Sequence, residues 1–117
     1  MKAPPGRLRR LSRQRDFSRL RRLGRSYHGP HLTIRAVRNE EGMVRVGFAI
    51  SKKLGKAVER NRLRRRLREG LRLSPIAPGW DILVIPRGDA VKQTYHTLKA
   101  EMEDLLRRAG AIGGATP

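Results

Sequence analysis

The chain has 117 residues, no cysteine, and 28 lysine and arginine residues against 10 acidic residues, which gives a formal net charge of +18. This length is enough for one domain with a modest core, and the lack of cysteine excludes a disulfide framework, a thiol nucleophile and a cysteine-based zinc site. A charge of this size needs a polyanionic partner, and the usual partners are nucleic acid and an anionic membrane surface.

The N-terminal part of the chain is basic and has little apolar surface. Residues 1–11 are expected to form a flexible basic arm, because they are rich in proline, glycine and arginine. Phe17 and Leu20 give residues 13–23 the thin apolar side of a short helix, with Ser12 as its N-cap. The arginines on its other faces would repel one another without a polyanion nearby, so this helix is expected to contact RNA.

Two segments with alternating apolar residues follow a turn-like connector at residues 24–30. Residues 31–38 and 44–51 are predicted to be the antiparallel strands of one hairpin, because an Asn-Glu-Glu-Gly turn joins them. Gly47 leaves one face of the second strand nearly bare, which permits close approach of a ligand or of another element. Phe48 belongs to the core face of this strand by alternation, but its ring also suits stacking on an unpaired base.

The stretch from residue 56 to residue 71 is predicted to be a helix that combines a leucine stripe with dense positive charge. The leucines recur every fourth residue and would pack on the body of the domain (Leu63, Leu67, Leu71). Six arginines lie within residues 60–68. At about 100° per residue, three of them fall opposite the leucines (Arg62, Arg65, Arg66). Arg60 and Arg64 fall nearer the leucines and would extend outward along their stems.

The remaining elements complete an α/β sandwich. Residues 81–86 are almost entirely apolar, which is typical of a central strand, and residues 91–108 carry the apolar stripe of a last helix. Residues 110–117 are expected to form a flexible tail, which leaves residues 12–109 as a single RNA-binding domain. The element order α-β-β-α-β-α predicts a small mixed sheet packed by helices on one face, with the other face available as a binding surface.

The sequence offers no self-contained catalytic or metal site. Its carboxylates lack the spacing of a metal-dependent nuclease, and there is neither a Walker loop nor a Gly-x-Gly-x-x-Gly motif. His28 and His31 lie three residues apart, but no neighbour is placed to orient them for a two-histidine ribonuclease mechanism. No apolar run approaches the roughly 18 residues of a membrane span, and no signal peptide is visible, so we expect a cytoplasmic protein without membrane contact.

One contiguous run carries a family resemblance. Residues 45–69 read RVGFAISKKLGKAVERNRLRRRLRE, which is an Arg-Val-Gly strand, then Ser-Lys-Lys, then a helix with Arg-Asn-Arg and further basic residues. This order resembles the protein subunit of bacterial ribonuclease P, and weaker similarity extends over most of the chain between residues 7 and 108.

The resemblance implies a function and an assembly. The catalyst would be an RNA, and the protein would be its basic cofactor in a holoenzyme, an endoribonuclease that removes the 5′ leader of precursor tRNA. The partners would be the catalytic RNA and the precursor tRNA, with no obligate protein partner and with Mg²⁺ bound mainly by RNA. The resemblance also implies that no residue of the protein is catalytic, and it assigns no residue of the protein as a metal ligand. Finally, it implies a left-handed crossover around the arginine helix, against the usual right-handed rule.

The resemblance and the helical wheel together assign two sets of binding residues. The catalytic RNA would contact basic and amide side chains before and along the arginine helix, namely Lys52, Lys53, Lys56, Arg60, Asn61, Arg62, Arg65, Arg66 and Arg68. The single-stranded leader would lie in a cleft between the sheet and the first helix, against Phe17, Arg21, His31 and Phe48. The family's second cleft aromatic falls at Arg21, and its aromatic positions on the next strand fall at His31 and Ile34, so this cleft holds fewer stacking rings.

Composition alone fits two other classes of protein. A small, cysteine-free, arginine-rich chain is also typical of a ribosomal protein or another structural RNA-binding protein, although the ordered Ser-Lys-Lys and Arg-Asn-Arg run argues against this alternative. A DNA-binding protein would place the arginine helix in a major groove, but only Asn61 and the arginines are available to read bases there.

Overall fold

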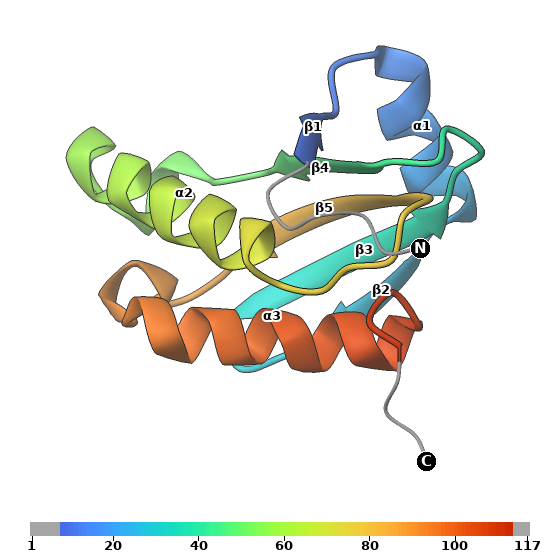
Figure 1. Cartoon of the computed structure of the whole chain (residues 1–117). Helices are drawn as coiled ribbons and strands as arrows, with labels where there is room; N and C mark the ends of the chain where they lie inside the picture. Colours follow the sequence, from blue (N-terminus) through green and yellow to red (C-terminus); the bar gives the residue numbers. More distant parts are fainter. Residues whose placement is uncertain (1–7, 114–117) are drawn as a thin grey trace.

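The protein is an α/β sandwich, as the sequence predicts, built on one five-stranded sheet (Figure 1). The computed structural model describes residues 8–113. The elements in chain order are β1 (Leu8–Arg10), α1 (Gln14–Leu23), β2 (Arg25–His28), β3 (Leu32–Arg38), β4 (Val44–Phe48), the 3₁₀ helix η1 (Lys52–Leu54), α2 (Ala57–Arg72), β5 (Trp80–Pro86), the 3₁₀ helix η2 (Ala90–Lys92) and α3 (Tyr95–Ala109).

Strand β5 is central in the sheet, whose order is β1-β4-β5-β3-β2. It pairs in parallel with β4 and antiparallel with β3, so the predicted pairing of β3 with β4 is wrong. Strands two apart in a sheet lie about 10 Å apart, and the five residues between Arg38 and Val44 are long enough to cross that distance. This crossing loop is tied to the start of β5, because Gly79 accepts the N–H of Asn39 at 2.8 Å and donates to Met43 at 3.1 Å.

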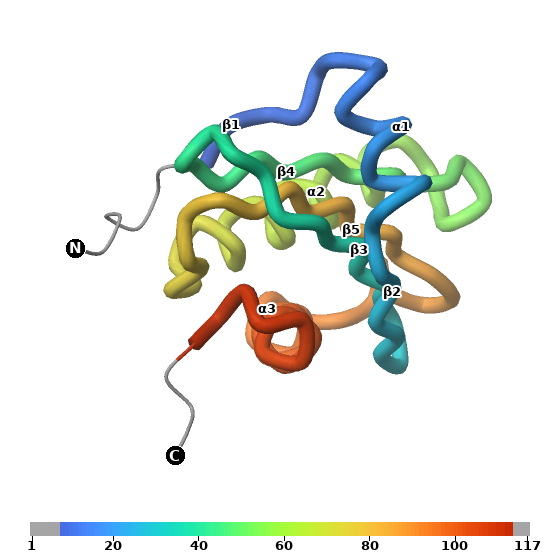
Figure 2. The backbone as a smooth tube through the Cα atoms, turned by 90° about the vertical axis from the view of Figure 1, so that its right-hand side faces the viewer, coloured from blue at the N-terminus to red at the C-terminus, as the bar shows by residue number. Residues whose placement is uncertain are grey.

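Helices α2 and α3 cover one face of the sheet, and α1 lies against the other (Figure 2). The three leucines of the predicted stripe are fully buried, as expected (Leu63, Leu67, Leu71). They pack with the inward side chains of β3, β4 and β5 and with the apolar stripe of α3 in one continuous core. Within residues 8–113 no helix has both the length and the apolar character needed to cross a membrane.

The connection from β4 through α2 to β5 is left-handed. In Figure 1 the two parallel strands point to the left with β4 above β5, and α2 passes in front of the sheet between them. Figure 2, turned by 90°, places α2 and α3 on the same side of the sheet. The chain therefore winds opposite to the usual right-handed sense, which is the handedness that the resemblance implies.

The two ends of the domain contain more structure than their composition indicates. Leu8–Arg10, expected within the arm, form β1 and pair in parallel with β4, while residues 1–7 lie outside the described part. Ala111 and Ile112, expected in the tail, are buried in the core, because the left-handed Gly110 turns the chain back onto the sheet side of α3. Residues 114–117 also lie outside the described part.

The connectors also differ from the expectation. Residues 25–28, expected in a turn, form β2 at the edge of the sheet beside β3. Helix α3 begins at Tyr95 rather than near residue 91, because the Thr94 hydroxyl accepts the N–H of Thr97 and caps the helix there. Ser12 is not the N-cap of α1; that position is held by Arg13, whose side chain makes no capping hydrogen bond.

Candidate nucleic-acid interface

The segment before α2 presents its lysines to solvent. The Ser51 hydroxyl accepts the N–H of Lys53 at 3.1 Å and so begins the short helix η1, on which Lys52 and Lys53 are exposed. Glu59 then accepts the N–H of Lys56 at 2.9 Å, which satisfies a donor at the start of α2. Capping of both helices therefore fixes the backbone from which these three basic side chains extend.

The arginines of α2 divide by their burial. Arg62 and Arg65 are exposed on the side away from the leucine stripe, whereas Arg60 and Arg64 are half-buried nearer to it, as the wheel predicts. Arg66 was expected to face solvent, but its side chain is partly buried. Its Nη1 donates at 3.2 Å to the carbonyls of Val91 and Gln93, so this guanidinium ties α2 to the segment that precedes α3.

A groove of about 770 Å³ brings together the two phenylalanines that the sequence assigns to the leader. Phe17 reaches it from α1, and Phe48 from the end of β4. The groove is lined by Leu8, Arg9, Arg10, Leu11, Phe17, Val46, Phe48, Arg64, Arg68 and Arg72. Rings for stacking thus lie beside guanidinium groups for phosphates, which is the composition of a single-stranded nucleic-acid site.

A smaller hollow of about 200 Å³ adjoins the groove along α2. It is lined by Asn61, Arg64, Arg65 and Arg68. Arg64 and Arg68 line both spaces, so they form the boundary between the groove and the outer surface of α2.

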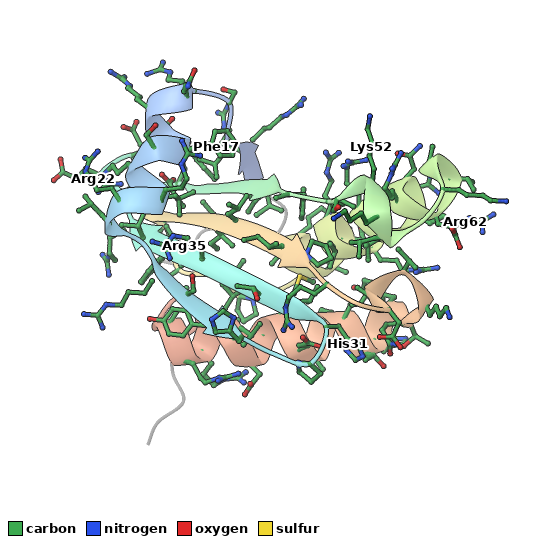
Figure 3. The ribbon with its side chains drawn as sticks, turned by 180° about the vertical axis from the view of Figure 1, so that it is seen from behind. Phe17, Arg22, His31, Arg35, Lys52 and Arg62 are labelled. Atoms are coloured by element: carbon green, nitrogen blue, oxygen red, sulfur yellow. The ribbon has the colours of Figure 1, made fainter. Side chains whose placement is uncertain are left out.

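The other two residues assigned to the leader lie outside this groove. Nδ1 of His31 is 2.9 Å from Oε1 of Glu101 on α3, and the other oxygen of that carboxylate accepts the N–H groups of His31 and Leu32. Figure 3 shows His31 well away from Phe17, near the opposite end of the sheet. Arg21 is exposed on α1, where its Nη2 lies 3.3 Å from the Ser18 hydroxyl.

Arg35 has a positioning role that the sequence analysis did not predict. It lies on the same sheet face as α1 and donates at 2.7 Å to the Leu20 carbonyl and at 2.6 Å to the Arg21 carbonyl. These carbonyls belong to the last turn of α1, where the Leu20 carbonyl also accepts the N–H of Gly24 at 2.9 Å. Arg35 therefore fixes that end of the helix (Figure 3). The sequence pattern of β3 could have indicated this role, because alternation places Arg35 on the sheet face opposite to that of the core residue Ile34.

The other end of α1 is fixed by a buried ion-pair network around Arg45, the first residue of the Arg-Val-Gly run. Arg45 binds both carboxylate oxygens of Asp81 at 2.8 Å and reaches Asp16 of α1 at 3.2 Å. Asn39 donates to Asp81 at 2.7 Å. The hydrogen bonds to Asp81 raise the pKa of Arg45 above its usual value, so this guanidinium stays charged.

Gly47 allows α1 to lie close to β4, as its lack of a side chain predicts. A Cβ atom at this position would lie 3.2 Å from Cε1 of Phe17 and 3.4 Å from Cδ1 of Leu11. The approaching element is therefore α1, and the glycine sets the depth at which the Phe17 ring meets the groove.

Among residues 8–113 there is no group of three or more histidine, aspartate or glutamate side chains that fits a metal ion. Asp16 and Asp81 both pair with Arg45. The groove, η1 and the exposed side of α2 offer guanidinium, ammonium and aromatic groups.

Comparisons with known proteins point to one family. A family model described as Ribonuclease P matches residues 6–110. The ribonuclease P protein component of Roseiflexus castenholzii is 42% identical over 109 residues, which cover 91% of this chain and 89% of the relative. The solved RNase P protein of Staphylococcus aureus is 32% identical with a TM-score of 0.79, covering 89% of this chain and 97% of that one. The RNase P protein from Thermotoga maritima is 31% identical with a TM-score of 0.76, covering 85% and 96%.

Replacing Arg45 by methionine should destabilise the domain strongly. Asp81 is fully buried, and removing its charged partner should cost about 3–5 kcal/mol of unfolding free energy, measured by urea denaturation. The variant Asp104→Asn breaks the exposed pair with Arg108 and should change stability little. Equal stability of Arg45→Met and the parent protein would contradict a structural role for the network.

Proposed function

The chain belongs to the ribonuclease P protein family, and from this we propose that it is the protein cofactor of an RNA-based holoenzyme that removes the 5′ leader from precursor tRNA. Family membership does not favour the ribosomal or structural RNA-binding alternative. In this proposal the catalytic RNA performs the cleavage in the cytoplasm, and no side chain of the protein reacts with the substrate. The protein instead lowers the repulsion between two polyanions and positions the scissile region.

The observation that supports leader binding is the groove between α1, β1, β4 and α2. Both phenylalanines face a space rimmed by five arginines, and stacking on such rings contributes about 1–3 kcal/mol per base without strong sequence preference. We assign Phe17 and Phe48 to the leader bases. Arg21 and His31 lie outside the groove, so we assign them to a continuation of the leader path along α1 and the sheet.

The exposed surface of η1 and α2 suits the catalytic RNA. Lys52 and Arg62 project from one side of the molecule (Figure 3), and Arg65 is also exposed on α2. Their charges would replace counterions on an RNA backbone. We assign the same partner to the neighbouring Lys53, Lys56, Arg60, Asn61 and Arg68. Arg66 uses one nitrogen inside the protein, which leaves its other nitrogens for this contact.

Mg²⁺ belongs to the RNA in this proposal. Among the described residues, no group of three or more histidine, aspartate or glutamate side chains fits a metal ion. The contribution of the protein is confined to charge and geometry.

The function is tested by 5′ processing of a precursor tRNA. The protein mixed with its catalytic RNA should release the leader, and the protein alone should release none, because it carries no catalytic group. Denaturing gels of end-labelled precursor measure the product. Cleavage by the purified protein without RNA would refute the proposal, and co-purification with ribosomal subunits at high salt would favour the ribosomal alternative.

Arg62→Ala and Arg65→Ala should weaken binding to the catalytic RNA. Each lost phosphate contact should reduce the slope of log K against log salt by about 0.7–0.9, measured by filter binding over a salt series. Arg107→Ala on α3 is the matched control, because it removes an exposed arginine from another surface. An unchanged slope for both α2 variants would contradict the assigned RNA face.

Phe17→Ala should mainly reduce the preference for substrate that carries a leader. Removing one stacking ring should lower the affinity of the holoenzyme for precursor tRNA, while affinity for mature tRNA should stay the same. Competition binding with the two tRNAs measures the ratio. The same loss for both tRNAs would show that Phe17 does not contact the leader.

A further inference from the structure

Three arginines on α2 form a row along the groove. Arg64, Arg68 and Arg72 are each four residues apart and all line it. Four residues of helix rise about 6 Å, which is comparable to the distance between neighbouring phosphates of an extended single strand. A strand that follows the groove can therefore meet one guanidinium per phosphate along this row.

The groove crosses the free edge of the sheet beyond the end of β1. Leu11 and Phe17 line it from the side of α1, next to Gly47. Val46 and Phe48 line it from the side of α2, because alternation along β4 turns them to the opposite face. The floor is apolar and aromatic, and β1 adds one guanidinium on each side of the sheet. Arg10 pairs with Val46 and so lies on the α2 side, whereas Arg9 pairs with Arg45 and lies on the α1 side. Bases thus have a floor to stack on, and phosphates have guanidinium groups beside it.

We propose that the row Arg64, Arg68 and Arg72, with Arg10 of β1 on the same side of the sheet, holds the phosphates of the RNA strand whose bases stack on Phe17 and Phe48. This inference rests on the proposed function and adds a phosphate-binding wall to the leader site. It divides α2 between two RNAs, so that Arg62 and Arg65 bind the catalytic RNA and Arg64 and Arg72 bind the substrate. Arg64 and Arg68 line both the groove and the adjoining hollow, so the boundary between the two RNAs runs along them.

Two contacts within α2 hold this row in place and compete with the RNA. Arg64 donates to the Asn61 side chain at 3.0 Å, and Arg72 forms a two-pronged ion pair with Glu69. The hydrogen bond from Arg72 lowers the pKa of Glu69, so this carboxylate is ionised at neutral pH. A phosphate that binds Arg72 must therefore displace Glu69 or share the Arg72 guanidinium with it. The proposal therefore predicts opposite effects for removing the arginine and for neutralising its carboxylate.

The test compares variants of the holoenzyme on precursor tRNA with a long leader and on mature tRNA without one. The double variant Arg64→Gln/Arg72→Gln should weaken precursor binding about tenfold and reduce its salt slope by about 1.4, from two contacts at about 0.7 each. Binding of mature tRNA and of the catalytic RNA should not change. Glu69→Gln should tighten precursor binding, because it releases Arg72.

Arg107→Gln/Arg108→Gln is the matched control, because it removes the same two charges from exposed positions on α3 and should not alter the preference for a leader. Thermal melting of each variant shows whether the fold is retained. An equal loss of affinity for precursor and mature tRNA would overturn the inference. So would a loss of catalytic-RNA binding with the leader preference intact, since the row would then face the other RNA.

Failure of the inference can be distinguished from failure of the proposed function. If the parent holoenzyme prefers the leader-bearing substrate and the double variant keeps that preference, the α2 row does not bind the leader, although the proposed function stands. If the parent protein gives no preference for a leader and no RNA-dependent cleavage, the proposed function itself is wrong.

Discussion

The interaction on which the site depends is the contact of Arg45 with two carboxylates. Asp81 is fully buried on the central strand, and a buried carboxylate without a charged partner would be strongly destabilising. Arg45 supplies that partner from β4 and extends to Asp16 on α1. One guanidinium therefore joins the middle of the sheet to the first helix. Because Phe17 follows Asp16 directly, the same contact determines where a ring of the groove lies.

The arginines of this protein fall into two groups that occupy different places in the fold. Some arginines satisfy groups of the protein: Arg45 neutralises Asp81, Arg35 binds carbonyls at the end of α1, and Arg66 binds carbonyls before α3. A planar guanidinium with several donors is suited to such multiple contacts. Others line the groove or the exposed side of α2, where their mutual repulsion would be relieved by RNA. The fully buried leucines of α2 supply the apolar burial that offsets this concentration of charge.

The left-handed crossover places the two surfaces that we propose to bind RNA on adjoining elements. β4 contributes Arg45 and Phe48, and the chain then passes through η1 directly into α2. The contiguous run of residues 45–69 thus contains a buried anchor, a groove wall and a basic helix. Arg64 and Arg68 line both the groove and the adjoining hollow, so a substrate strand and a partner RNA would meet along one helix. This proximity suits a cofactor that brings two polyanions together.

The sandwich, the leucine stripe, the central strand and the family could all be predicted from the sequence alone, because each depends on local periodicity or on a contiguous motif. The structure decided the features that depend on residues distant in the chain. Insertion of β5 between β3 and β4 could not be read from a turn that looked like a hairpin. Alternation along β4 and the bare Gly47 predicted only part of the arrangement that brings Phe17 and Phe48 to one groove. The position of His31, away from both rings, became visible only through its contact with Glu101. The arginines that bind groups of the protein could not be distinguished by sequence from the solvent-exposed ones, because an arginine looks the same in the sequence whether its acceptor is a carbonyl of the protein or a phosphate.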